Sequence, residues 1–316
     1  MKLAEQLKLS DHIKIHPMKT DLLITDSLKG IYFPQAGAID MAHYCQWLLS
    51  EIAESQLTVY AESPVTNIQF SDHGWQIVFD PSSGLDKVVD ANFQHIIDCR
   101  GAAAISFGKL NSELDTALDH LHTTAGQTCQ FHSPRLAKQV TQVLCGKVYL
   151  IPLADDQFIL GSSFEDQASS ANSNDLLLKP AIQDQLLEKM NQLLRDSHIP
   201  PLTDSELQVI PLQGKRAYRL HAQDRLPLVG PAINAMKLSR DFNKLGQKSL
   251  NRDELSHYNQ PGYWLNTAYG SHGLLFSMLA SQHLVSLICG EISPLNTDIS
   301  HAIHPARFFI RHLKQK

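Results

Sequence analysis

Apolar and polar positions recur along this chain with the period of a strand in some stretches and of a helix in others. The first thirty residues have no firm period. From Ile31 onward the pattern predicts, in chain order, a helix at 41–56, strands at 57–63, 65–71, 74–80, 95–99, 123–131, 147–153 and 158–165, a helix at 179–196, a strand and a helix within 263–291, and a short helix in the tail. Residues 213–231 are expected to be irregular and 232–261 to form a long exposed insertion. This mixture favours an α/β or mixed α+β fold class with two interleaved lobes.

Local signals mark where several of these elements begin and end. Asp40 is the expected N-cap of the first helix, and Asp72-His73-Gly74 suits a hairpin turn. Asp155-Asp156 supplies a second turn between strands, and Pro200-Pro201 is expected to end helix 179–196. That helix carries apolar side chains at helical spacing, which predict its buried face: Leu186, Leu187, Met190, Leu193 and Leu194.

The most informative stretch runs from Tyr263 to Glu291. An apolar strand there meets Gly270-Ser271-His272-Gly273 and then a long helix-compatible run. The N–H groups of a first helical turn lack partners and the helix dipole adds partial positive charge, so a phosphate or an electron-rich ring can dock there. The stretch therefore suggests a nucleotide or flavin site. No two glycines of the sequence are separated by a single residue, however, so the G-x-G-x-x-G fingerprint is absent.

The composition is that of a globular protein, with 43% hydrophobic and 19% charged residues. The net charge of -5 argues against a nucleic-acid binder that depends on a basic field over the whole domain. Local basic clusters are compatible with that charge, although a solvated surface is their commoner role. They are Arg307, Arg311, His312, Lys314 and Lys316 in the tail, and Lys237, Arg240, Lys244 and Lys248 upstream.

The cysteines and histidines of the sequence indicate the cellular compartment and whether a metal site is expected. The five cysteines, an odd count without a C-x-x-C pair, are expected to be reduced core residues of a cytoplasmic protein: Cys45, Cys99, Cys129, Cys145 and Cys289. No signal peptide is evident, and polar residues interrupt the apolar run 272–290, which favours a buried helix over a membrane span. The histidine pairs 120/122 and 301/304 lack acidic or cysteine partners at ligand spacing, so no metal is expected.

Two side chains are candidates for binding a small ligand. Arg216 could receive a carboxylate through two parallel hydrogen bonds, and Tyr149 offers a hydroxyl from a predicted strand. A surface arginine and a core-edge tyrosine are the alternatives. Gly161-Ser162-Ser163 resembles a nucleophile elbow only in part, because the second glycine that the motif requires is missing, and this disfavours a hydrolase.

The order of the motifs resembles the FAD-dependent oxidoreductases of the D-amino-acid oxidase and glycine oxidase family. The motifs are FPQAGAID, IIDCRGAAA, AGQ, YLIP with ILGSS, GKR with DRLPLVGP, and YGSHGLL before a helix. Within the family the likeness is greatest to the oxidoreductase half of the bifunctional enzymes that make 5-methylaminomethyl-2-thiouridine in tRNA. It covers about residues 31–316 and rests on the ordered set of motifs rather than on one of them.

The resemblance implies two lobes and a site. Residues 31–105 and 225–316 would form an incomplete FAD-binding lobe and 106–224 an antiparallel-sheet substrate lobe, while 1–30 stay unassigned. Arg216, in the counterpart of the family's G-x-R-P segment, would bind the substrate carboxylate with Tyr149 as a second donor. The contacts to FAD would come from small and first-turn residues after two strands: Gly101, Ala102, Gly270, Ser271, His272, Gly273 and Leu274.

The activity that the resemblance implies is an FAD-dependent oxidation of a CH–NH bond in tRNA. Hydride would pass from the glycine-like carbon of carboxymethylaminomethyl-uridine, at the wobble position, to FAD. Hydrolysis of the imine would then release glyoxylate. A free amino-acid or small-amine oxidase of the glycine oxidase type is the alternative within the same chemistry.

The sequence departs from the family at three places. The family begins with a βαβ unit whose G-x-G-x-x-G binds the FAD pyrophosphate, and this sequence lacks that motif. Cys99-Arg100 stand where the family favours small apolar residues, and Ala217 replaces the proline of the arginine segment. A truncated, non-catalytic fragment that binds no FAD alone is therefore a further alternative, as is an upstream partner chain that supplies the pyrophosphate-binding unit and a methyltransferase domain.

Overall fold

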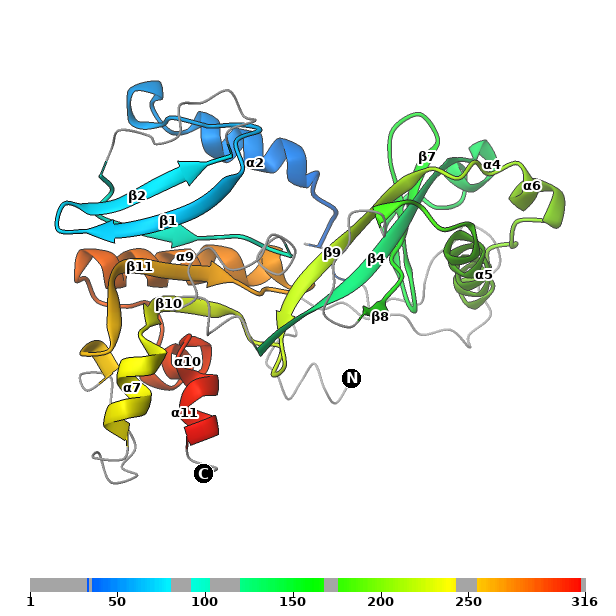
Figure 1. The fold of residues 1–316 in the computed structure, drawn as a ribbon. Helices are drawn as coiled ribbons and strands as arrows, with labels where there is room; N and C mark the ends of the chain where they lie inside the picture. The colour runs from blue at the N-terminus through cyan, green and yellow to red at the C-terminus, as the bar shows by residue number, and fades with distance from the viewer. Residues whose placement is uncertain are drawn as a thin grey trace. The chain divides into compact units, whose positions relative to one another are not determined.

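The computed structural model describes residues 33, 36–80, 92–102, 120–167, 176–242 and 255–313 (Figure 1). By its contacts the chain divides into two compact units, each assembled from separate segments. Unit 1 comprises Met1–Thr58, Gly126–Glu165 and Leu176–Ala217, and unit 2 comprises Val59–Ala125, Asp166–Asp175 and Tyr218–Lys316. Helices and antiparallel strands are mixed along the chain, which confirms the predicted fold class.

The sheet that contains most of the strands of unit 1 has the order β5-β6-β7-β4-β8, with β9 paired to β4, and parts of β4, β8 and β9 are assigned to unit 2. The pairs β5–β6, β6–β7 and β7–β4 are antiparallel. Asp155 and Asp156, both with φ near +55°, form the turn between β6 and β7, as predicted. The strands are β4 (Leu121–His132), β5 (Leu144–Cys145), β6 (Tyr149–Pro152), β7 (Gln157–Gly161), β8 (Glu165–Gln167) and β9 (Gly214–Ala222).

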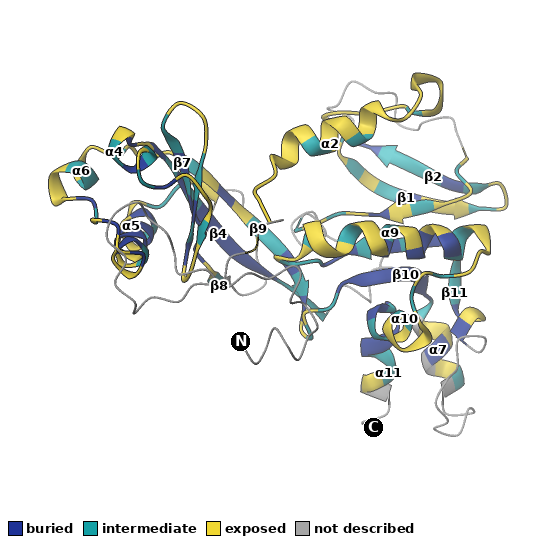
Figure 2. Cartoon of the chain, turned by 180° about the vertical axis from the view of Figure 1, so that it is seen from behind, coloured by how far each residue is buried: buried dark blue, intermediate teal, exposed yellow. Residues whose placement is uncertain are grey.

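Helix α5 (Pro180–Asp196) covers the core of unit 1 with the predicted stripe. Figure 2 shows one side of this helix buried and the other exposed. Leu186, Leu187, Met190 and Leu194 pack with Phe131, Leu150, Phe158 and Leu160 of the sheet. The helix ends before Pro200-Pro201, because His198 already adopts φ +56°. The buried Asn191 amide then holds the following segment through two 2.9 Å hydrogen bonds to the backbone of Leu202. Two short helices, α4 (Pro134–Ala137) and α6 (Asp204–Gln208), complete the described part of this lobe.

Unit 2 contains a three-stranded sheet in the order β10-β11-β3. Strand β10 (Leu228–Ile233) is antiparallel to β11 (Asn259–Thr267), whereas β3 (Ile96–Asp98) is parallel to β11. The hairpin of β1 (Val65–Ser71) and β2 (Gly74–Phe79) turns at Asp72-His73, as predicted. Its buried Trp75 joins the core of the sheet and donates a 2.8 Å hydrogen bond to the Pro261 carbonyl.

Helices of unit 2 flank this sheet. Helix α9 (Gly273–Cys289) lies beside β10 and β11 (Figure 1). Helix α10 (Thr297–Ile303) contacts β10, and α11 (Arg307–Leu313) contacts both α10 and α7 (Ala235–Phe242). The expectation of a buried helix at 272–290 is met only in part. Ala280, His283, Leu284 and Ser286 are buried, whereas Leu275 in the first turns is 74% exposed.

The predicted helix 41–56 was too long. Helix α2 spans Met41–Ser50 with Asp40 as its N-cap, as expected, and a separate short 3₁₀ turn follows at Glu54–Gln56. The Ser50 hydroxyl donates to the Trp47 carbonyl, a local bond that competes with continuation of the helix. The predicted strand at 57–63 was wrong as well. Glu62 adopts φ +54° there, which is incompatible with an extended strand.

The predictions for 213–261 were wrong in two ways. The stretch 213–231 contains β9 and most of β10 rather than an irregular segment, because polar side chains on β9 hide its alternation. Residues 232–261 were expected to form an exposed insertion, yet α7 and the start of β11 lie in them, and Leu238, Leu255 and Tyr258 are buried together. Residues 243–254 lie outside the described part of the chain.

The cysteine expectation holds for one residue. All five cysteines are free, but only Cys129 is buried and the other four are exposed. Among the described residues no helix is long and apolar enough to cross a membrane, and no three histidine, cysteine or acidic side chains gather as a metal site would require. The basic tail is not simply a solvated surface either, because Arg307 is buried.

Candidate functional site

Two segments that were predicted to contact a flavin meet at one edge of the sheet in unit 2. Strands β3 and β11 are parallel, and Asp98 is paired with Leu265, so both strands end on the same side. Gly101-Ala102 follow β3, and Gly270 to Leu274 follow β11. The Thr267 hydroxyl donates a 2.7 Å hydrogen bond to the Arg100 carbonyl, which links the two strand ends. Ligands of open α/β sheets bind outside the carboxyl ends of such strands.

The turn after β11 is shaped by its backbone. Gly270 adopts φ +57°, and its N–H donates a 2.8 Å hydrogen bond to the Leu220 carbonyl. Tyr269 donates from its hydroxyl to Asn266, whose amide donates in turn to Ser281 of α9 at 3.3 Å. Burial, together with the nearby Cys99 thiol, raises the pKa of Tyr269, so this hydroxyl keeps its proton. These bonds fix the direction in which α9 begins.

The first turn of α9 is open to a ligand. Its N-cap residue, His272, makes no capping hydrogen bond with its side chain, and Ser271, His272 and Leu274 are exposed. Helix α9 has 17 residues, long enough for a full dipole at its N-terminus. An anionic or electron-rich group could therefore bind at its first N–H groups.

Arg100, one of the departures from the family pattern, forms an ion pair with Asp98 at this edge of the sheet. Its Nη2 lies 2.7 Å from Asp98 Oδ2, and Nε lies 3.0 Å from both carboxylate oxygens. Tyr263 donates a further hydrogen bond of 2.9 Å to the same carboxylate. The positive charge of Arg100 is thus balanced by a buried partner on β3.

The residues at this edge fit one part of FAD. An uncapped helix N-terminus and two small residues, Gly101 and Ala102, suit the flavin ring. Space beside Gly101 is open, since a Cβ atom built there would meet nothing within 4 Å. The G-x-G-x-x-G cradle for the pyrophosphate does not occur in the sequence.

In unit 1, Arg216 forms a two-bond ion pair with a carboxylate of the protein itself. Its Nη1 donates to Glu165 Oε1, and its Nη2 donates to Glu165 Oε2 at 2.9 Å. The Arg216 side chain has no exposed surface, whereas the Glu165 side chain is 20% exposed to solvent. The hydrogen bonds from Arg216 outweigh burial and hold the pKa of Glu165 below its usual value.

Position 214, two residues before this arginine, requires a glycine. With φ +151° it lets β9 approach β4 so closely that a Cβ atom would lie 2.0 Å from the Thr128 carbonyl oxygen. The Lys215 N–H then donates to the Thr128 hydroxyl at 3.2 Å. This close approach sets the register that carries Arg216 into the interior.

Tyr149 lies against Gly161 on the neighbouring strand. The two residues are paired in the ladder between β6 and β7. A Cβ atom at Gly161 would be 2.5 Å from the Tyr149 hydroxyl oxygen and 2.9 Å from a methyl of Thr128. The glycine thus makes room for the ring, which is half-buried in unit 1.

Sequence reasoning missed the carboxylate partner of Arg216 and its surroundings. Ser163 donates to Glu165 Oε1 at 3.1 Å, and Lys179 Nζ lies 4.0 Å from Oε2. The buried Gln127 binds the Ser163 hydroxyl through its N–H at 2.8 Å and the backbone of Lys179 through its amide. The sequence carries no local signal for this pair, because Glu165 lies 51 positions before Arg216.

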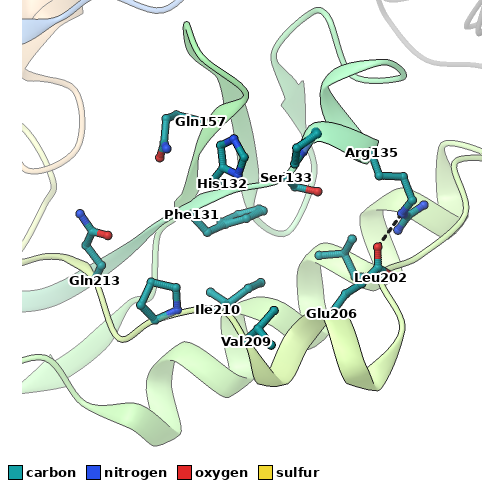
Figure 3. Close-up of a pocket in the computed structure, with 12 residues that line it drawn as sticks. Phe131, His132, Ser133, Arg135, Gln157, Leu202, Glu206, Val209, Ile210 and Gln213 are labelled. Atoms are coloured by element: carbon teal, nitrogen blue, oxygen red, sulfur yellow. Dashed lines mark hydrogen bonds and ion pairs between the residues drawn. The ribbon is translucent and has the colours of Figure 1, made fainter.

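A cavity of about 410 Å³ also lies in unit 1, away from these candidate residues (Figure 3). Phe131, Ile210 and Val209 line it, and neither Arg216 nor Tyr149 is in its lining. Its arginine, Arg135, is held by Glu206 at 2.8 Å and by the carbonyls of Pro200 and Pro201. This charge is therefore already paired.

The fold and the motifs define a flavoenzyme. The chain belongs to the family of FAD dependent oxidoreductases, which it matches over residues 4–287.

Among curated proteins it is similar to two bacterial enzymes named tRNA 5-methylaminomethyl-2-thiouridine biosynthesis bifunctional protein MnmC. The one from Pseudomonas fluorescens is 25% identical over 284 residues, 90% of this chain and 40% of the relative. The one from Chromobacterium violaceum is 30% identical over 188 residues, 60% of this chain and 27% of the relative. The chain thus spans less than half the length of these relatives.

Solved structures show the same fold. Iminodiacetate oxidase from Chelativorans is similar with a TM-score of 0.63 and 14% identity, covering 96% of this chain and 70% of that one. Glycine oxidase from Geobacillus kaustophilus has a TM-score of 0.53 and 13% identity, covering 80% of this chain and 54% of that one.

Proposed function

We propose that this chain is the oxidoreductase part of a tRNA-modifying flavoenzyme in the cytoplasm. It would remove the carboxymethyl group from carboxymethylaminomethyl-uridine at the wobble position and release glyoxylate. The relatives named for tRNA modification support this, because the one from Pseudomonas fluorescens matches 90% of this chain.

The observation that carries the proposal is the carboxylate receptor in unit 1. A guanidinium with no exposed surface receives a carboxylate through two parallel bonds, the geometry that a glycine-like substrate group requires. Arg216 would bind that group of the substrate, and Tyr149 would offer a second donor. In unit 2, FAD would be held by Gly101, Ala102, Gly270, Ser271, His272, Gly273 and Leu274.

The secondary amine of the substrate loses a hydride from its glycine-like carbon and a proton from nitrogen, which gives an imine. Water adds to the C=N bond, and cleavage of the C–N bond yields aminomethyl-uridine and glyoxylate. When bound, FAD would supply the two-electron acceptor for this oxidation. The N-terminus of α9 would stabilise negative charge that develops next to it.

The test is turnover of tRNA that carries carboxymethylaminomethyl-uridine. The full chain is incubated with FAD and this tRNA, and digested nucleosides and glyoxylate are measured by mass spectrometry. We expect equal amounts of aminomethyl-uridine and glyoxylate, with glycine and N-methylglycine as much poorer substrates. Turnover of the free amines alone would refute the tRNA assignment. A chain that takes up no FAD and converts neither substrate would refute the proposal for the chain acting alone.

A further inference from the structure

The carboxylate that fills the Arg216 receptor belongs to the protein. Because the Arg216 side chain has no exposed surface, an incoming carboxylate can replace Glu165 only where Glu165 now lies. The Glu165 side chain is 20% exposed, so a ligand can reach this position from solvent. Substrate binding and the internal ion pair are therefore alternatives for the same donors.

A displaced Glu165 has other donors close by. Ser163 already donates to one of its oxygens, and the Lys179 ammonium is 4.0 Å from the other. Gln127 fixes both neighbours, since it binds the Ser163 hydroxyl and pairs with the Lys179 backbone through its amide. A small rotation of Glu165 toward Lys179 would keep its charge paired while Arg216 is vacated.

We propose that Glu165 is an internal competitor, which occupies the Arg216 receptor until a substrate carboxylate displaces it toward Lys179. The inference rests on the proposed role of Arg216 as that receptor. The affinity of every carboxylate ligand is multiplied by the fraction of molecules in which the receptor is free. This factor is the same for a small free amino acid and for a carboxylate on a large, separately anchored substrate. It therefore lowers the occupancy by weakly bound free amino acids at concentrations at which the larger substrate, held by its other contacts, still fills the site.

The charge of Glu165 supports this competition. The hydrogen bonds from Arg216 lower its pKa, with Ser163 and Lys179 contributing in the same direction, so Glu165 is anionic at neutral pH. Glutamine at this position would keep the size of the side chain but remove the charge that competes with a ligand. Glu188, an exposed glutamate on α5, offers a matched control for loss of one negative charge in the same unit.

The experiment measures binding of N-methylglycine by calorimetry to the full chain, with N-methylglycinamide as the ligand that lacks a carboxylate. We expect Glu165→Gln to lower the Kd for N-methylglycine by about tenfold or more, as removal of an internal competitor predicts. Glu188→Gln should have no effect. Adding Arg216→Met to Glu165→Gln should abolish the gain. The amide should bind all variants equally weakly.

Two results would overturn the inference, and they differ. If Arg216→Met weakens binding but Glu165→Gln does not strengthen it, Glu165 is no competitor while the receptor role stands. If binding depends on Arg216 in neither background, both the inference and the receptor role fail. Should Glu165→Gln lose its native circular dichroism, Lys179→Met is the second test. It should weaken N-methylglycine binding by about threefold, because the displaced carboxylate loses its new partner, and an unchanged Kd would contradict the displacement.

Discussion

Replacing Arg307 tests how the end of the chain is held to unit 2. Nε and Nη2 of Arg307 each donate to an oxygen of Asp224 at 2.9 Å, and its other hydrogen bonds go to the carbonyls of Leu226, Pro227, Ile303 and His304. The side chain is 4% exposed and that of Asp224 20%. The DRLPLVG motif therefore anchors α11 to the residues that precede β10.

Arg307→Met removes this buried cation and leaves Asp224 with Arg311, at 2.9 Å, and the backbone N–H of Leu226, at 3.2 Å. Breaking a buried pair from one side costs about 3–5 kcal/mol. Because Arg311 remains, we expect the lower end, about 3 kcal/mol, which corresponds to a fall in Tm of about 6–12 °C.

Arg311→Met is the matched control, since the same substitution removes a side chain that binds the same carboxylate but is 53% exposed. Its cost should stay below about 1 kcal/mol. Thermal unfolding followed by circular dichroism measures both variants. Equal shifts in Tm for the two would show that burial of Arg307 does not set its contribution, and the reasoning would be refuted.

Three more predictions concern single groups. Gly214→Ala would place a Cβ 2.0 Å from the Thr128 carbonyl oxygen, so we expect a loss of about 3 kcal/mol or more in unfolding free energy, measured by urea denaturation. Burial alone would raise the pKa of Asp224, but Arg307 outweighs it and lowers that pKa. The pair between Arg307 and Asp224 therefore stabilises the fold at pH values above the pKa that Asp224 has in the unfolded chain, about 4. As the pH falls below that value, the difference in unfolding free energy between wild type and Arg307→Met should shrink. Tyr149→Phe should raise the KM for the carboxylate substrate about tenfold without changing Tm, as loss of one hydrogen bond to a charged group predicts.

Elements with strong local signals could be predicted from the sequence. Asp40 accepts hydrogen bonds from the N–H groups of Ala42 and His43, as an N-cap does. The α5 stripe and the Asp155-Asp156 turn depend on residues that are neighbours in the chain. Local chemistry decides such features, which is why the sequence reveals them.

Contacts between distant residues could not be predicted in this way. Arg216 was a candidate from its motif, but Glu165 lies 51 positions earlier and meets it only through the pairing of strands with β4. Asp224 and Arg307 are 83 positions apart, so the motif around Asp224 looked irregular and the tail looked like a solvated basic cluster. In both cases the sequence showed the arginine but not the carboxylate that binds it inside the same unit.

The central claim is that a carboxylate held by Arg216 belongs to the molecule that this flavoenzyme oxidises. The most direct measurement is anaerobic bleaching of the flavin absorbance after FAD-loaded protein is mixed with tRNA that carries carboxymethylaminomethyl-uridine. The account predicts rapid bleaching by this tRNA, none by tRNA that carries aminomethyl-uridine, and a large loss of rate at limiting tRNA in Arg216→Met. Equal bleaching by wild type and Arg216→Met would contradict it.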